Sequence, residues 1–131
     1  MARIVQAINI YGPKLELNQM SHLEQVAKWL AMRSGLNKNE VRMVLGELSE
    51  AILFYNNQGN PVKLDGIGIF RPSINRKGEV KINFRADTAL KKGLTYETYS
   101  GSIRNRTRIG LDNQGYKDLW DPDHPDDPLD I

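Results

Sequence analysis

The stretch that decides the fold is Gly59–Arg85, which reads GNPVKLDGIGIFRPSINRKGEVKINFR. Its first half predicts a strand in which Val62 and Leu64 alternate with polar residues, followed by two isoleucines in the opposite phase. Because one additional residue turns every later side chain to the other face, the phase change predicts a bulge or a sharp bend beside Gly66.

The second half of this stretch predicts another strand, half-buried and basic on its outer face. Val80, Ile82 and Phe84 alternate with charged or amide side chains, which is typical of an antiparallel strand that covers a core with one face. Between the two strands, the sequence N-R-K-G at 75–78 places Gly78 where a hairpin often needs a positive φ. We therefore expect an antiparallel β-hairpin.

Length and composition are those of one ordinary globular domain with appendages. The chain has 131 residues, of which 40% are hydrophobic and 26% charged, and it has no cysteine, so disulfides and thiolate metal sites are excluded. The first residues lack the apolar run of a signal peptide, and no segment approaches the roughly 20 apolar residues that span a bilayer. We expect a soluble, cytoplasmic protein without contact to membranes.

Charge is distributed unevenly along the chain. Residues 1–59 have a balance of +1, whereas residues 60–111 have eleven lysines and arginines against four acidic residues, a balance of +7. Residues 112–131 have one lysine against seven aspartates, a balance of −6. A basic middle segment beside an acidic end indicates binding to a polyanion, and the alternative is a surface whose opposite ends attract each other.

Two helices are predicted before the hairpin. Ser21, with Glu24 three residues later, has the pattern of a capping box, and Ser34-Gly35 closes the first helix. Asn37 or Asn39 caps the second, which ends at residues 56–59 after a wide apolar stripe of Val41, Val44, Leu45, Leu48, Ala51, Ile52, Phe54 and Tyr55. The short link predicts an antiparallel helical hairpin, and the stripe predicts either a well-buried helix or, as we favour, contact with a second subunit.

The remaining segments have weaker patterns. Residues 3–10 predict a strand or extended arm, and residues 86–94 a short helix capped by Asp87 or Thr88. Residues 95–111 predict mostly loop, in which Arg104, Arg106 and Arg108 alternate on one face of an extended segment. That spacing suits a phosphate backbone, although a solvated basic face packed against the acidic tail is the other interpretation.

The C-terminal residues predict one amphipathic helical turn and then no helix. Tyr116, Leu119 and Trp120 have helical spacing after a cap at Asp112 or Asn113, and the three prolines at 122, 125 and 128 argue against a helix over residues 121–131. This end is predicted to be either an extended segment that packs on the protein or a disordered acidic tail.

Enzymatic chemistry has few candidate residues. His22 lies beside a helix cap, and His124 lies among aspartates whose spacing does not form a calcium-binding loop. Gly66-Ile67-Gly68 lacks the third glycine of a dinucleotide-binding motif. We predict no catalytic residues, no cofactor and no metal site.

The order of these elements resembles the bacterial histone-like HU and integration host factor family. The match covers residues 21–94, and its most specific parts are V-K-L-D-G-I-G-I-F at 62–70 and F-R-A-D-T-A-L-K-K-G-L at 84–94. The resemblance implies an α+β fold: a helical hairpin, a β-hairpin and a short helix within an intertwined homodimer. It also implies nucleoid-associated, architectural binding to DNA, with paired arms in the minor groove.

The sequence departs from this family in the arm and at both ends. Only thirteen residues separate Phe70 from Phe84, and Pro72 lies at a strand end instead of an arm tip, so no wedge residue carries over. Asp87 and Thr88 stand where the family commonly has glycine and lysine. Residues 1–20 and 95–131 are extensions of the family pattern, and the chain predicts phosphate-backbone binding better than DNA wrapping.

The leading prediction is a non-enzymatic, homodimeric protein that binds double-stranded DNA through its phosphates, with low sequence specificity. The alternative is a dimeric scaffold that keeps the fold and has lost DNA binding, with a protein partner for the C-terminal extension. The residues predicted to contact DNA are Arg71, Arg76, Lys77, Lys81, Arg85, Lys91, Lys92, Arg104, Arg106 and Arg108.

Overall fold

The computed structural model describes residues 1–130 and divides into two compact units. The first, here called the terminal unit, contains Met1–Gln19 together with residues 100–130; the second, the central unit, contains Met20–Tyr99. Most of the two flanks that the sequence analysis treated separately, residues 1–19 and 100–130, therefore belong to one unit. Met20 and residues 95–99 of the predicted extensions belong to the central unit, and residue 131 lies outside the described residues.

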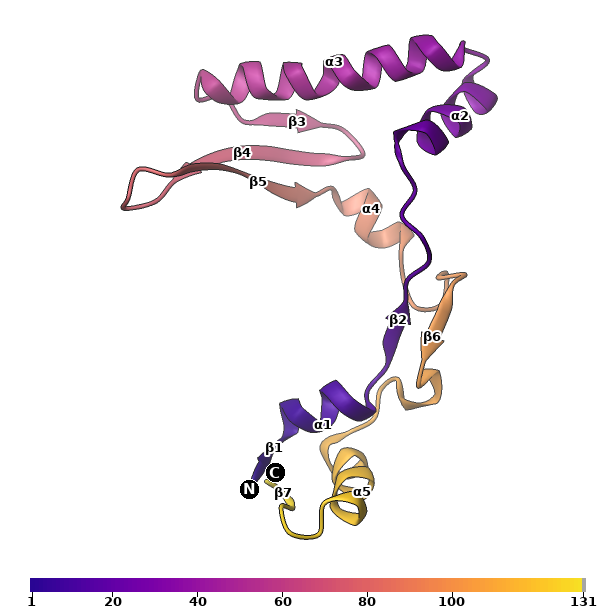
Figure 1. Cartoon of the computed structure of the whole chain (residues 1–131), viewed down its shortest axis with the longest axis vertical. Helices are drawn as coiled ribbons and strands as arrows, with labels where there is room; N and C mark the ends of the chain where they lie inside the picture. Colours follow the sequence, from indigo (N-terminus) through magenta and orange to yellow (C-terminus); the bar gives the residue numbers. More distant parts are fainter. Residues whose placement is uncertain (131) are drawn as a thin grey trace. The chain divides into compact units, whose positions relative to one another are not determined.

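Two antiparallel helices open the central unit, as predicted: α2 at Leu23–Ser34 and α3 at Lys38–Asn57 (Figure 1). Asn37 caps α3, since its Oδ1 accepts from the Asn39 amide at 2.8 Å, and Gly35 ends α2 with a φ of 77°. The cap predicted at Ser21 is wrong by one residue, because α2 begins after His22, whose amide donates to Gln25 Oε1 at 2.6 Å.

Glu24 consequently has a different role from the predicted capping box. Its carboxylate pairs with Lys38 Nζ at 3.0 Å and Arg42 Nε at 2.8 Å, which connects the start of α2 to the first turns of α3. The hydrogen bond from Lys38 and the positive charge of Arg42 lower the pKa of Glu24 below its ordinary value.

The central unit has a three-stranded antiparallel sheet in the order β3–β4–β5, formed by Val62–Leu64, Gly68–Ile74 and Val80–Ala86. Of the two alternatives predicted beside Gly66, the structure has the sharp bend and not the bulge: the chain reverses there, with Leu64 opposite Gly68 and the Ile67 amide donating to the Leu64 carbonyl. The segment predicted as one strand therefore forms both β3 and the start of β4. A reversal changes the phase of the side chains just as a bulge does. Gly66 has a φ of 83°, and a Cβ on Gly68 would clash with the Phe84 ring.

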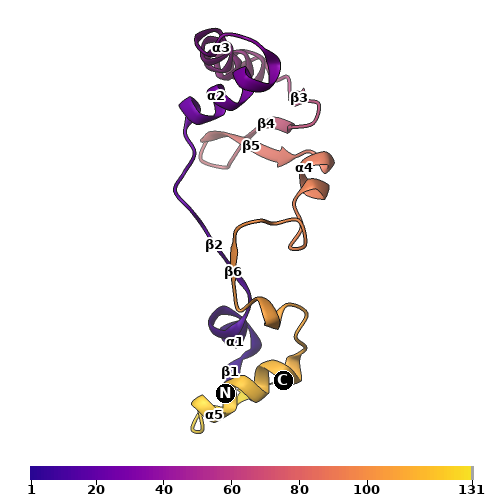
Figure 2. The same ribbon diagram turned by 90° about the vertical axis from the view of Figure 1, so that its right-hand side faces the viewer.

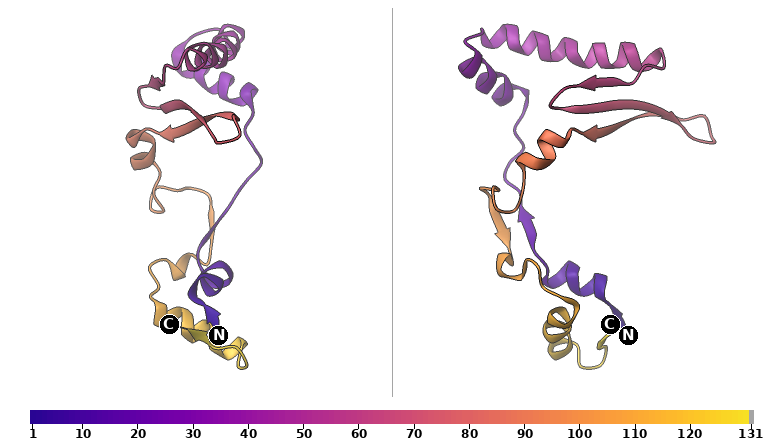
Figure 3. Two further views of the ribbon diagram at one scale, coloured as in Figure 1. Left: turned by 90° about the vertical axis from the view of Figure 1, so that its left-hand side faces the viewer. Right: turned by 180° about the vertical axis from the view of Figure 1, so that it is seen from behind.

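The predicted hairpin and the short helix after it are confirmed. Residues 75–79 join β4 to β5, with Gly78 at a φ of 85°, and α4 spans Thr88–Gly93. Asp87 caps α4, because its Oδ1 accepts from the Ala89 amide at 2.8 Å. In Figures 1 and 3, α3 lies along β3 and β4, and the end of the β4–β5 hairpin extends past the end of α3.

The terminal unit combines both ends of the chain. Its elements are β1 (Ala2–Arg3), α1 (Ile4–Tyr11), β2 (Lys14–Glu16), β6 (Ser102–Arg104), the 3-10 turn η1 (Arg106–Arg108), α5 (Asn113–Asp123) and β7 (Leu129–Asp130). β1 pairs with β7 in parallel and β2 pairs with β6 antiparallel; Figure 2 shows β2 and β6 side by side, next to α1.

The strand predicted over residues 3–10 is wrong, because most of that segment is α1. Ile4, Ala7 and Tyr11 are spaced for one helix face, and they pack in the core cluster that also contains Tyr116 and Trp120 of α5. Tyr11 and Trp120 meet edge to face with ring centroids 6.2 Å apart. The Tyr11 hydroxyl donates to Asp123 Oδ2 at 2.6 Å, which raises the pKa of Tyr11. Helical spacing therefore places these three residues together on one core, to which α5 contributes from far away in the sequence.

The C-terminal segment packs onto the terminal unit instead of forming a free tail. The prediction of no helix after Trp120 is wrong for three residues: α5, capped by Asp112, continues through Pro122 to Asp123. A proline so near the helix end removes only one intrahelical hydrogen bond. The chain then folds back, so that the Trp120 indole donates to the Asp127 carbonyl at 2.7 Å and Leu129 is buried between the elements.

Across residues 1–130, none of the helices combines the length and the apolar character that crossing a bilayer requires.

Candidate nucleic-acid interface

The register of the sheet separates its side chains into two faces of opposite character. Val62, Phe70 and Phe84 are directly opposite one another across the three strands, so they share one face. The neighbouring positions Lys63, Ile69 and Arg85 are also in register and lie on the other face. Alternation then assigns the remaining residues of the hairpin to one face or the other.

The face of Lys63 and Arg85, here called the basic face, is polar along most of its length. Beyond these two residues, it contains the pair Arg71–Asn83 and the pair Ser73–Lys81. Asn83 Nδ2 donates to Ser73 Oγ at 2.7 Å, which joins the two strands across this face. Its lysines and arginines are solvent-exposed, and no ion pair between them and an acidic side chain occurs within residues 1–130.

Four uncompensated cations on one short sheet make a surface that attracts phosphates. Three of them, Arg71, Lys81 and Arg85, are candidate contacts from the sequence. The fourth, Lys63, was missed, because β3 was not separated from β4 and its register with Arg85 was therefore not visible. The alternation of Lys63 with Val62 and Leu64 was the signal that could have found it.

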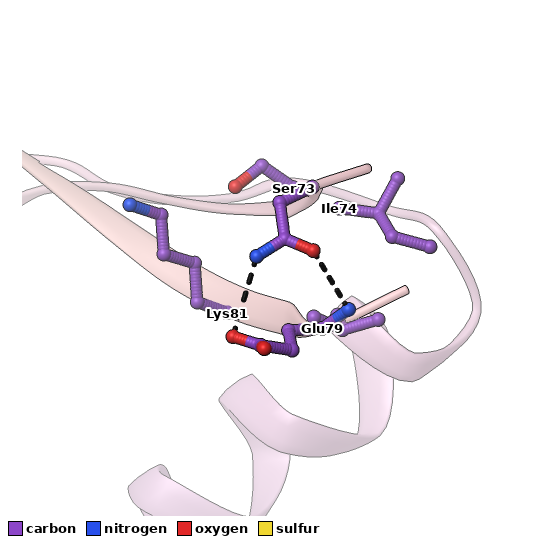
Figure 4. Close-up of a pocket in the computed structure, with 6 residues that line it drawn as sticks. Ser73, Ile74, Glu79 and Lys81 are labelled. Atoms are coloured by element: carbon purple, nitrogen blue, oxygen red, sulfur yellow. Dashed lines mark hydrogen bonds between the residues drawn. The ribbon is translucent and has the colours of Figure 1, made fainter. Parts of the chain in front are cut away.

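The hairpin end carries Arg76 and Lys77 on a turn that Asn75 organises. Figure 4 shows Ser73 and Ile74 before this turn and Glu79 and Lys81 after it. Asn75 Oδ1 accepts from the amides of Lys77 at 2.9 Å and Glu79 at 3.0 Å, and its Nδ2 donates to the Glu79 carboxylate at 3.3 Å. Because the Asn75 side chain fixes this turn, the exposed Arg76 and Lys77 are held at the hairpin end, and no long loop has to become ordered.

Lys91 and Lys92 are exposed in the last turn of α4, where a positive charge also complements the helix dipole. The start of α4 is anchored to the sheet, since the Asp87 amide donates to the Ile67 carbonyl at 2.8 Å. These two lysines are thereby attached to the end of the sheet at which Lys63 and Arg85 lie.

The sequence predicted that the three C-terminal arginines share one face of an extended segment. In the structure they do not. Arg104 ends β6 and pairs with Glu16 at 3.5 Å, whereas Arg106 and Arg108 lie in the turn η1 after a left-handed Asn105. Arg108 Nη1 donates to the Tyr11 carbonyl at 2.9 Å, so this residue stabilises the end of α1. Contact of these three residues with DNA stays a prediction.

The opposite surface, here called the apolar face, is incompletely covered within one chain. Phe84 is 51% exposed and Val80 67% exposed, although their cross-strand neighbours Phe70 and Ile74 are also apolar. On the helices, a groove of about 410 Å³ is lined by Leu30, Ser34, Leu36, Glu40, Val41, Val44 and Leu45. The central unit therefore leaves apolar surface on both its sheet and its helices.

Comparisons with known proteins identify a family and similar solved structures. Residues 10–100 match the HU-HIG family, described as an HU domain fused to wHTH, Ig, or glycine-rich motif. Among solved structures, an HU mutant from Thermotoga maritima is 21% identical, with a TM-score of 0.47, and the alignment covers 55% of this chain and 96% of that one. A cocrystal structure of Anabaena HU with DNA is 21% identical, with a TM-score of 0.44 and coverages of 55% and 95%.

No curated protein is significantly similar to the chain. The family match nevertheless spans more than half of the sequence and includes the helical hairpin, the complete sheet and α4. The chain is a member of the HU-HIG family of HU-domain proteins.

Proposed function

We propose that the protein is a non-enzymatic, homodimeric DNA-binding protein of the nucleoid, which contacts the phosphates of double-stranded DNA with low sequence specificity. The contacts come from Lys63, Arg71, Lys81 and Arg85 on the basic face, extended by Arg76 and Lys77 at the hairpin end and by Lys91 and Lys92 on α4. Membership in a family of HU-domain proteins supports DNA as the ligand.

One observation carries this proposal: strand register places all four cations of the sheet on one face and the aromatic side chains on the other. Lysine and arginine contact phosphates without reading base identity, so such a face favours duplexes of any sequence. Affinity should therefore depend steeply on salt, because each neutralised phosphate releases counterions.

The dimer follows from the apolar face. Large apolar side chains of the sheet and of α3 are half or more exposed in one chain, among them Phe84, Val44 and Phe54. Burying a side chain of this kind stabilises by about 1.5–3 kcal/mol, so a second copy that covers them supplies a large driving force. A two-fold symmetric dimer would also present two basic faces to one duplex.

The proposal is tested by fluorescence anisotropy of a labelled duplex of about 30 base pairs, titrated with the full chain at several salt concentrations. The logarithm of the binding constant should fall linearly with the logarithm of the salt concentration. In Arg71→Gln/Arg85→Gln, the steepness should drop by about one for each phosphate that is no longer neutralised, with weaker binding to every sequence alike.

The control is Arg3→Gln/Lys14→Gln, which removes two exposed positive charges from the terminal unit and should change affinity much less. An equal decrease in affinity in both variants would mean that net charge, and not the basic face, determines binding. If the folded wild-type dimer bound no duplex even at low salt, the DNA proposal would be wrong and the scaffold interpretation would replace it.

A further inference from the structure

The hairpin that carries the basic face ends in a turn without apolar side chains. Asn75, Arg76, Lys77, Gly78 and Glu79 form the connection, and Asn75 holds both Lys77 and Glu79 by hydrogen bonds. Proteins that kink DNA from the minor groove insert an apolar side chain, such as proline, isoleucine or phenylalanine, between base pairs. The end of this hairpin has no such side chain to insert.

The nearest apolar side chains belong to the wrong face for insertion. Ile74 and Val80 are paired across the strands next to the turn, and Pro72 and Ile82 form the pair before them. Both pairs continue the face of Phe70 and Phe84, opposite to Arg71, Lys81 and Arg85. Near the hairpin end, a duplex held against the basic face therefore meets cations, Ser73 and Asn83, whereas the apolar pairs are directed away from it. Ile69, an apolar residue of the basic face, lies at the other end of the sheet, between Lys63 and Arg85.

The hairpin is also too short to enclose a duplex. Phe70 is fixed to α3, because its carbonyl accepts from Asn56 Nδ2 at 3.3 Å. From Phe70 to Ile74 the strand advances four residues, or about 14 Å at the usual rise per residue. Bending DNA costs free energy that must be recovered from additional contacts, and so short an arm reaches few additional phosphates.

We propose, on the basis of the DNA-binding function above, that the protein binds double-stranded DNA without bending it. The ligand is a straight duplex that lies on the basic face, and the hairpin end adds phosphate contacts through Arg76 and Lys77. Selectivity for bent, gapped or flexible DNA is absent, because no part of the binding free energy depends on deforming the duplex.

The test measures binding and bending on the same molecules. A duplex of about 30 base pairs, labelled with a donor and an acceptor at opposite ends, is titrated with the full chain until its anisotropy saturates. The transfer efficiency should equal that of the free duplex throughout. An increase in transfer efficiency in parallel with the anisotropy would overturn the proposal, while the DNA-binding function would stand. No change in anisotropy would overturn both the proposal and the DNA-binding function.

Two variants separate charge from insertion. Arg76→Gln/Lys77→Gln should weaken binding and lower its salt dependence without changing end-to-end transfer. Ile74→Ser/Val80→Ser should leave both quantities unchanged if the variant is folded and dimeric. A bend in the wild-type complex that disappears in this second variant would show that the apolar pair inserts after all.

Competition with gapped DNA gives an independent measurement. A duplex of the same sequence with a short central gap bends easily, so a DNA-bending protein binds it more tightly. We expect the two dissociation constants to agree within about twofold, because no bending energy is saved. A preference of about tenfold or more for the gapped duplex would contradict the proposal.

Discussion

The terminal unit and the central unit differ in how completely each buries its apolar side chains. The terminal unit buries Trp120 to 4% and Leu129 to 1% exposure, using only segments of its own chain. The central unit is larger, yet among its described residues only Ala27 and Val41 are buried apolar side chains, and Phe84 is half-exposed. The terminal unit, which combines both ends of the chain, completes a core from its own segments. The open sheet and the helical hairpin of the central unit do not cover all of their own apolar side chains.

This difference separates two kinds of exposed apolar residue. In the terminal unit, residues such as Val5 lie outside a core that is already closed. In the central unit, Phe84 and Val44 lie on surfaces that no segment of the described chain covers. The exposed fraction of a side chain does not distinguish the two kinds of residue. The comparison is therefore best tested by making the same substitution at one residue of each kind.

The largest effect is expected from Phe84→Asp. A charge at this position would be buried without a partner in the proposed dimer, so the dimer should dissociate almost completely at micromolar concentration. Light scattering after size-exclusion chromatography measures the mass directly. The matched variant Val5→Asp places the same charge on the terminal unit and should keep the wild-type mass; dissociation in both variants, or in neither, would break the comparison.

A smaller but still large effect is expected from Trp120→Ala. Truncating a buried tryptophan costs about 3–5 kcal/mol, which is most of the stability that a unit of this size can have. In an amide correlation spectrum, the signals of residues 1–19 and 100–130 should collapse while those of 20–99 persist. Trp29→Ala, which removes the other tryptophan, should leave the terminal-unit signals in place; their disappearance there would mean that the two units unfold together.

The smallest effect is the acid sensitivity of each unit. Lys117 and the Leu129 amide donate to Asp121 and lower its pKa, so its carboxylate stabilises the terminal unit above the unfolded pKa of about 3.9. That contribution should disappear as the pH falls through the lower, folded value. We expect the melting temperature of the terminal unit to fall below about pH 4 and to fall less steeply in Asp121→Asn.

Glu24→Gln provides the corresponding variant in the central unit. Lys38 and Arg42 lower the pKa of Glu24 in the same direction, but this ion pair is more exposed to solvent than that of Asp121. Solvent screening should make its effect on acid unfolding the weaker of the two. A larger effect of Glu24→Gln than of Asp121→Asn on acid unfolding would contradict the conclusion that the ion pair of Asp121 is the less exposed of the two.

What could be predicted from the sequence were the features set by near neighbours in the chain. The caps at Asn37, Asp87 and Asp112 and the turn at Gly78 each depend on side chains within a few residues, and the structure confirms them. Hydrophobic alternation likewise found the strands of the hairpin. A phase change, however, has two physical causes, and the pattern could not distinguish the reversal at Gly66 from a bulge.

What could not be predicted depends on partners distant in the sequence. Residues 4–11 form a helix whose apolar face packs in a core that includes Trp120, more than a hundred residues later. The hydrogen bond from Arg108, a predicted phosphate contact, to the Tyr11 carbonyl joins residues 97 positions apart, and no local pattern indicated it. The candidate contacts on the sheet depended on local alternation, and their common face emerged only once the register was known.

The pairing of β1 with β7 has a consequence for the order of events during synthesis. Ala2 is opposite Leu129, so the terminal unit lacks an essential strand until almost all of the described chain has been translated. At ribosomal rates of about 5–20 residues per second, the first helix waits on the order of 6–25 s for its partner. The helices α2 and α3 are translated within this interval, so we expect the helical hairpin to form before β1 pairs with β7.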